Sequence, residues 1–232
     1  MLDNKDFVLF GNQHLVVVIL LFFFGIILIL WAQKQSNQTQ LKTGFFFAFS
    51  LSSTVLIWIF LKIYLNGFDI KNDLPFHLCN FIALFLPLFT IYRKQVIYDI
   101  LLFWILAGTS HAIITPDLQQ GFPNFVFFKY WYVHAGLIIF IFYATFIYKM
   151  RPNFKSIFIS FLAFQGYLLL MLFINKVTGA NYLYTNQKPD GETLLTHLGD
   201  WPYYIFMVEL FILPYFLIIY LPFHLTRKKQ QQ

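Results

Sequence analysis

The sequence predicts an all-α polytopic membrane protein: a single membrane domain over residues 1–232, built as a bundle of seven transmembrane helices. Only 11% of the residues are charged and 59% are hydrophobic, whereas a soluble domain has about 25% charged residues. Long apolar runs recur through the whole chain, and no polar block between them is long enough to form a separate globular unit. Lysine and arginine concentrate in alternate connectors, the pattern of a chain that crosses a bilayer repeatedly.

Seven segments are apolar and long enough to be candidate membrane spans. A transmembrane helix needs about 20 mostly apolar residues to cross about 30 Å of hydrocarbon. The segments are 15–31, 45–65, 74–91, 96–114, 130–148, 157–174 and 203–223. The third is short and contains Pro75 and Pro87, which makes it the weakest of the seven. The first is preceded by Asp3 and Asp6 rather than by a basic region, so we expect a retained helix and not a signal peptide.

The connectors also predict the orientation. Those after the first, third, fifth and seventh segments are basic and contain no acidic residue; they hold Lys34, Lys42, Arg93, Lys94, Lys149, Arg151, Lys155, Arg227, Lys228 and Lys229. Because basic connectors stay in the cytoplasm, we expect a multi-pass plasma-membrane protein with its N-terminus outside and its C-terminus in the cytoplasm. The dispersal of the basic residues argues against a nucleic-acid partner. We expect membrane lipids as partners, and the sequence leaves the oligomeric state open.

A layer of polar residues lies on the predicted outer side. Five of the six histidines fall there, namely His14, His77, His111, His134 and His197. The single cysteine, Cys79, belongs to the same layer, about one turn into the third segment, and Glu209 lies within the seventh. Ionisable groups at membrane depth are energetically costly and by default mark a functional site.

Cysteine and histidine at one depth point to covalent catalysis. A thiol becomes a useful nucleophile when a neighbouring base or cation stabilises its thiolate. Several of the histidines can serve as that base for Cys79, and a carboxylate such as Glu209 or Asp117 can orient the histidine, as the third member of a triad does. Such a site at the boundary between headgroups and acyl chains would meet the ester bonds of phospholipids without extracting the lipid.

Two motifs carry a resemblance to a known family. The segment Leu74-Pro75-Phe76-His77-Leu78-Cys79-Asn80 opens the third helix, and Leu198-Gly199-Asp200-Trp201-Pro202-Tyr203-Tyr204 leads into the last. In these motifs, and over almost its whole length, the chain resembles the bacterial YwaF family of integral membrane proteins. That family is similar, more distantly, to a eukaryotic transmembrane acyltransferase that moves fatty acyl groups between phospholipids with a cysteine and a histidine. The resemblance implies that Cys79 is the nucleophile and His134 is the histidine.

Two enzymatic hypotheses follow. The first is an acyl-transfer or lipid-hydrolysing enzyme at the outer leaflet, in which His134 is the general base for Cys79 and His77 or His111 assists. The second is a metal-dependent membrane hydrolase, because three imidazoles and a carboxylate make a good zinc site with an open position for water. Its candidate ligands are His77, His111, His134 and Glu209. Zinc is the cofactor of this second hypothesis; otherwise none is expected.

A third hypothesis belongs to another class, a small-molecule transporter or receptor whose entrance is the outer polar layer. Pro75, Pro87 and Gly108 would interrupt helices that line a cavity. The connector 176–201 is long enough to act as a lid. Against this hypothesis, the sequence has no inverted repeat and few charges deep in the membrane.

Overall fold

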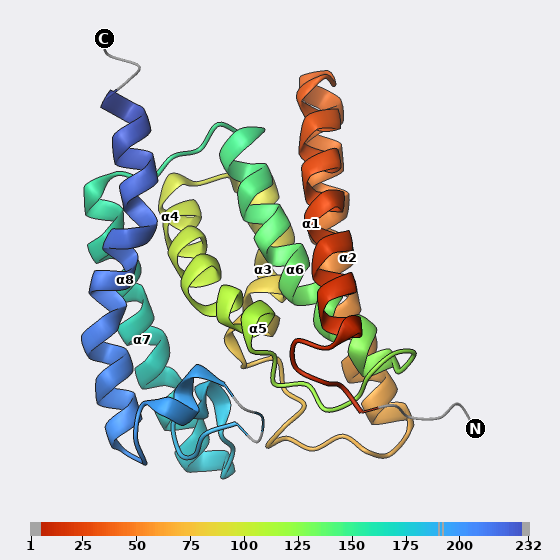
Figure 1. Ribbon diagram of the computed structural model, residues 1–232, viewed down its shortest axis with the longest axis vertical. Helices are drawn as coiled ribbons and strands as arrows, with labels where there is room; N and C mark the ends of the chain where they lie inside the picture. The colour runs from red at the N-terminus through yellow and green to blue at the C-terminus, as the bar shows by residue number, and fades with distance from the viewer. Residues whose placement is uncertain (1–5, 190, 192, 229–232) are drawn as a thin grey trace.

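The computed structural model describes residues 6–189, 191 and 193–228. This part of the chain forms a bundle of seven helices (Figure 1). Six of them are α1 (Asn12–Gln33), α2 (Asn37–Tyr64), α3 (Leu78–Tyr92), α6 (Phe125–Phe146), α7 (Phe154–Thr178) and α8 (Tyr203–Lys228). The fourth in chain order consists of α4 (Gln95–Trp104), the π-helical turn η1 (Ile105–Thr109) and α5 (Ser110–Ile114). Two short 3-10 turns, η2 (Tyr182–Tyr184) and η3 (Leu194–His197), lie between α7 and α8.

Six of the helices are long and apolar enough to cross a membrane. The all-α class and the multi-pass membrane character are thus confirmed. The remaining helix, α3, has 15 residues, which corresponds to about 22 Å at 1.5 Å per residue. It is therefore shorter than the predicted segment 74–91, and shorter than the thickness of a typical hydrocarbon core.

Several helix boundaries differ from the predicted ones because polar caps, rather than the edges of apolar runs, decide where a helix begins. α2 starts at Asn37 and not at residue 45, since the Ser36 hydroxyl accepts a hydrogen bond from the Thr39 N–H at 3.3 Å. α6 starts at Phe125 and not at residue 130, and its cap is Asn124. Beyond these two, α7 extends over 154–178 and α8 over 203–228, both longer than predicted.

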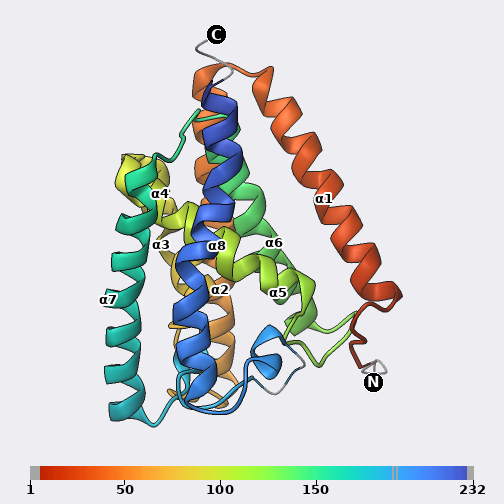
Figure 2. The ribbon, with the colours of Figure 1, turned by 60° about the vertical axis from the view of Figure 1, so that its left-hand side comes forward.

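The connectors alternate between the two ends of the bundle. Residues 34–36, 93–94 and 147–153 lie at the end that also holds the last turn of α8 (Figures 1 and 2). The segments 65–77 and 115–124 and the described parts of 179–202 lie at the opposite end, beside the start of α1. We call these the C-terminal end and the N-terminal end of the bundle. The predicted basic connectors after the first, third and fifth segments belong to the C-terminal end.

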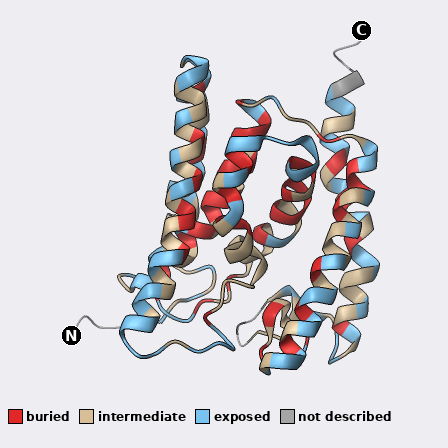
Figure 3. Ribbon diagram, turned by 180° about the vertical axis from the view of Figure 1, so that it is seen from behind, coloured by how far each residue is buried: buried red, intermediate tan, exposed pale blue. Residues whose placement is uncertain are grey.

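Helix α6 lies at the centre of the packing and α1 at the edge. In the apolar 18-residue stretch of α6, half of the residues are buried, more than in any other candidate span. In the corresponding stretch of α1 only 11% are buried. α6 packs against α1, α2, α3 and η1, and α7 packs against α4 and α8. Figure 3 shows the buried residues on the faces that these helices turn toward one another. Large apolar side chains such as Phe22, Phe23 and Ile27 face outward from α1, as expected of a lipid-facing surface.

The close approach of α2 and α6 yields a test of this packing. A Cβ atom at Gly136 would lie 2.4 Å from Leu51 Cδ2, and Leu51 is fully buried and has little room to move. We expect Gly136→Ala to lower the free energy of unfolding by about 1–3 kcal/mol, the usual cost of overpacking. Unfolding of the purified protein in mixed micelles, followed by circular dichroism, measures this change.

Gly166 on α7 supplies the matched control. A Cβ atom there meets nothing within 4 Å, so Gly166→Ala should leave the packing intact and stabilise the helix by up to about 1 kcal/mol through its better helix propensity. Equal losses of stability in the two variants would contradict the described packing of α2 on α6.

Candidate active site

Cys79 lies in the first turn of α3 at the N-terminal end of the bundle. Residues 74–77 form turns instead of helix, because Pro75 disfavours a helical conformation at Leu74 and His77 has the extended conformation of an N-cap. Cys79 is half-buried and packs against the main hydrophobic core. Its Sγ lies 3.4 Å from Thr109 Oγ1. The thiol therefore faces the protein interior rather than the lipid.

The partner of the thiol comes from the π-helical turn. Thr109 is fully buried and is the last residue of η1. A π-turn places an extra residue in the helix and changes its direction, and α5 departs visibly from the direction of α4 (Figure 2). η1 contacts α3, α6 and α8. The π-turn thus places the Thr109 hydroxyl against the first turn of α3, in the protein interior.

His134 is positioned by the preceding turn of its own helix. Its Nδ1 lies 2.7 Å from the Tyr130 carbonyl oxygen, and because that oxygen only accepts hydrogen bonds, Nδ1 carries the hydrogen. The two rings lie 4.1 Å apart between centroids. In a neutral imidazole the lone pair is then on Nε2. The Tyr130 hydroxyl donates to the Ala112 carbonyl oxygen at 2.8 Å and lies within electrostatic range of Cys79.

His77 lies at the entrance to α3, among aromatic rings of the last connector. Its ring centroid is 5.3 Å from that of Tyr182 and 5.2 Å from that of Tyr184. Burial, and to a smaller extent the nearby Lys129 ammonium, lower the pKa of His77 to about 4, although the carboxylate of Asp117 acts in the opposite direction. His77 is therefore neutral near pH 7. It also lies within electrostatic range of His134.

The last connector is held over this end of the bundle by buried polar contacts. Asn175 at the end of α7 donates to the Tyr182 carbonyl oxygen and to Thr185 Oγ1, both at 2.8 Å, and accepts from the Tyr182 N–H at 2.9 Å. Asp117 accepts from the Tyr184 hydroxyl at 3.0 Å and from the Gly191 N–H at 3.1 Å. Asp117, suggested by sequence as an acid that orients a histidine, instead joins the segment 115–124 to the last connector.

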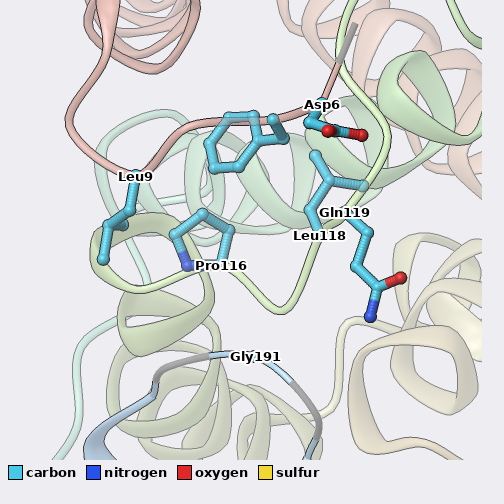
Figure 4. A pocket seen from close by; sticks show the side chains of 7 residues that line it. Asp6, Leu9, Pro116, Leu118, Gln119 and Gly191 are labelled. Atoms are coloured by element: carbon cyan, nitrogen blue, oxygen red, sulfur yellow. The ribbon is translucent and has the colours of Figure 1, made fainter. Parts of the chain in front are cut away.

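A cavity of about 400 Å³ opens beside this contact (Figure 4). It is lined by Asp6, Phe7, Leu9, Pro116, Leu118, Gln119 and Gly191. Neither Cys79 nor His134 lines it. Because its walls carry few groups able to do chemistry, we assign the candidate site to the cysteine and histidine and not to this cavity.

Two of the sequence-predicted site residues, His111 and Glu209, have partners outside the candidate site. His111 packs its ring against Tyr215 of α8 at 5.5 Å between centroids. Glu209 accepts a hydrogen bond from Gln165 Nε2 at 2.7 Å, so its partner at membrane depth is an amide rather than a histidine. In the described part of the chain, no three His, Cys, Asp or Glu side chains form a group that could hold a metal ion. The four donors of the zinc hypothesis therefore do not converge.

Sequence reasoning missed two members of the site. Tyr130 is not among the sequence-predicted site residues, although its spacing of four residues from His134 places both on one face of a helix. Thr109 carries no comparable signal, because its approach to Cys79 depends on the π-turn.

The role of Asp117 in holding the last connector is open to direct measurement. We expect Asp117→Ala to speed amide hydrogen exchange in residues 180–187 by about tenfold, because each hydrogen bond to a charged group contributes about 1.5–3 kcal/mol. Asp200→Ala is the control in the same connector: the Asp200 side chain is 98% exposed and is 3.4 Å from Lys188 Nζ, and such surface pairs contribute little. Equal acceleration in the two variants would show that the contact with Asp117 does not hold the connector.

Comparison with known proteins places the chain in a family. Residues 9–220 match the model of the TMEM164 family. An uncharacterized protein of Treponema pallidum (strain Nichols) is 26% identical over 168 residues, which are 72% of this chain and 69% of that protein. No solved structure matches. The family match covers the seven helices through most of α8, and it includes Cys79, Thr109, Tyr130 and His134. This chain is therefore a multi-pass membrane protein that belongs to the TMEM164 family.

Proposed function

We propose that this protein is a membrane-embedded enzyme that transfers fatty acyl groups between lipids through a thioester on Cys79. One observation carries the proposal: the single thiol of the chain lies within electrostatic range of Tyr130, and the carbonyl oxygen of Tyr130 accepts the Nδ1–H of His134, which leaves the Nε2 lone pair to accept a proton. The resemblance of the sequence motifs to a Cys/His phospholipid acyltransferase points to the same pair.

Two features of its surroundings would stabilise a thiolate on Cys79. The residue lies in the first turn of α3, where the helix dipole and the unpaired N–H groups stabilise negative charge. The Thr109 hydroxyl, 3.4 Å from Sγ, can donate a hydrogen bond to the ionised sulfur. These two contributions oppose the cost of forming a charge inside the protein.

The first half of the reaction forms the thioester. His134 Nε2 takes the proton from the thiol as Sγ attacks the carbonyl carbon of a lipid ester. The bond between that carbon and the ester oxygen breaks, and the departing oxygen takes the proton from His134 as it leaves as the hydroxyl of a lysolipid. Tyr130 has the role of the third member of a triad, because it holds the imidazole in the required tautomer.

The second half reverses these steps with a different acceptor. The hydroxyl of another lysolipid gives its proton to His134, attacks the thioester carbon and releases the thiol. Water in place of the lysolipid gives hydrolysis. With the basic connectors in the cytoplasm, the site lies at the outer leaflet, near the boundary where ester bonds of phospholipids are found.

Acyl exchange in proteoliposomes tests the proposal. With a labelled phospholipid and an unlabelled lysophospholipid, we expect Cys79→Ala to abolish transfer and His134→Gln to slow it by about 10²–10⁴-fold, the usual contribution of a general base. A labelled, hydroxylamine-sensitive adduct should form on the wild-type protein and be absent in Cys79→Ala.

His197→Gln is the matched control, because His197 is exposed in the last connector and should leave transfer unchanged. Full acyl transfer by Cys79→Ala would rule out the thioester. Lipid movement between leaflets that needs no acyl exchange and persists in Cys79→Ala would favour a transporter instead.

A further inference from the structure

Two lysines share one tryptophan where the end of α2 meets the start of α6. Lys62 Nζ lies 5.2 Å and Lys129 Nζ 4.8 Å from the centroid of the Trp58 ring. Trp58 is also stacked on Phe125, with 5.9 Å between centroids and 16° between planes. We call Trp58, Lys62 and Lys129 the lysine–tryptophan cluster. It lies at the N-terminal end of the bundle, the same end as Cys79 (Figure 1).

Lys62 has an ion-pair partner among the described residues, and Lys129 has none. Lys62 forms an ion pair with Asp73 at 3.4 Å. Asp73 is buried, and its backbone loop folds around it, since its Oδ2 also accepts from the Asp69 N–H at 2.8 Å. Within the residues that the structure describes, Lys129 has neither an ion pair nor a hydrogen bond through Nζ. Only one of the two ammonium groups therefore has a carboxylate within ion-pair distance.

The unpaired charge of Lys129 is costly where it stands. Lys129 is only partly exposed, and its neighbours on α6 are apolar or aromatic, so water screens its charge poorly. The contact with Trp58 recovers about 0.5–2 kcal/mol, but the second ammonium on the same ring repels it. An anion placed between the two lysines would remove both the unpaired charge and the repulsion.

The position of the cluster identifies the anion. Trp58 and the two lysines lie at the ends of membrane-spanning helices, the level at which tryptophan and lysine meet lipid headgroups. Exposed large side chains also occur at this level, namely Tyr64 and Leu65 at the end of α2 and Phe125 at the start of α6. The anion that is abundant at this level and attached to apolar chains is the phosphodiester of a phospholipid.

The cluster is also electrically coupled to the candidate active site. Lys129 acts on both His77 and His134 through space. A lipid whose phosphate was held by Lys129 would therefore have its glycerol and ester groups, which lie just below the phosphate in a bilayer, on the same side of the bundle as Cys79.

We propose that Lys62 and Lys129, with Trp58 between them, bind the phosphate of a phospholipid headgroup and so position the lipid ester for the cysteine. This inference deepens the proposed function and rests on it for the role of the bound lipid, but the binding itself is measured without turnover. It assigns Lys62, Trp58 and Lys129 as the residues that would distinguish a phosphate-bearing glycerolipid from a neutral ester lipid such as diacylglycerol.

Equilibrium binding in the Cys79→Ala background tests the site. The probes are fluorescent phosphatidylglycerol, a diacylglycerol with the same acyl chains, and inorganic phosphate. We expect Lys129→Met to raise the Kd for phosphatidylglycerol about tenfold, the effect of losing one charge-assisted contact to phosphate. Lys129→Arg should bind normally, and the affinity for diacylglycerol should not change.

Lys176→Met is the matched control, because Lys176 is an exposed lysine near the same end of the bundle. The inference is overturned by an unchanged Kd in Lys129→Met, by an equal loss in Lys176→Met, or by an equal loss of diacylglycerol affinity. Lysine-dependent binding of inorganic phosphate without binding of phosphatidylglycerol would overturn the lipid assignment in favour of a soluble anion. Binding is measured in Cys79→Ala, which cannot form the thioester. The result for headgroup binding is therefore independent of whether the wild-type protein transfers acyl groups.

Discussion

Inside hydrocarbon every backbone N–H and C=O group must find its partner within the protein, and this constraint governs the rest of the structure. It requires the chain to cross as helices, and it confines irregular backbone to places that other helices cover. The π-turn η1 obeys it: Thr109 is fully buried, and α3, α6 and α8 contact the turn. The irregular turn that brings a hydroxyl to Cys79 is thus tolerated because protein surrounds it.

The same constraint connects the end of α5 to the candidate site. Two of its last carbonyl groups are satisfied by side chains: the Tyr130 hydroxyl donates to Ala112, and His14 Nε2 donates to Ile113 at 2.9 Å. Tyr130 then uses its own carbonyl oxygen to fix the tautomer of His134. His14, which is buried among aromatic rings, has a structural role. One hydrogen-bonded network therefore both closes the helix and prepares the proposed base.

Much of the fold was predictable, because hydropathy and connector charge are properties of single segments. The start of α2 was missed because its first two turns are polar, although the Ser36 cap was visible in the sequence. In the site, the sequence proposed Cys79 and His134 from their shared predicted depth and from motif resemblance, and their catalytic roles stay a prediction. The pairing of Glu209 with Gln165 could not be predicted from the sequence, because a partner on another helix depends on how the two helices are rotated against each other.

By itself the sequence determined the membrane class and the number of helices, since both follow from single segments and their preference for lipid or water. Only the tertiary structure decided which members of the polar layer meet. It joined Cys79 to Thr109 and His134 to Tyr130, and it turned His111 and Glu209 toward other partners. The physical reason is that the helical repeat fixes which residues share a face, whereas packing over the whole bundle fixes what that face contacts.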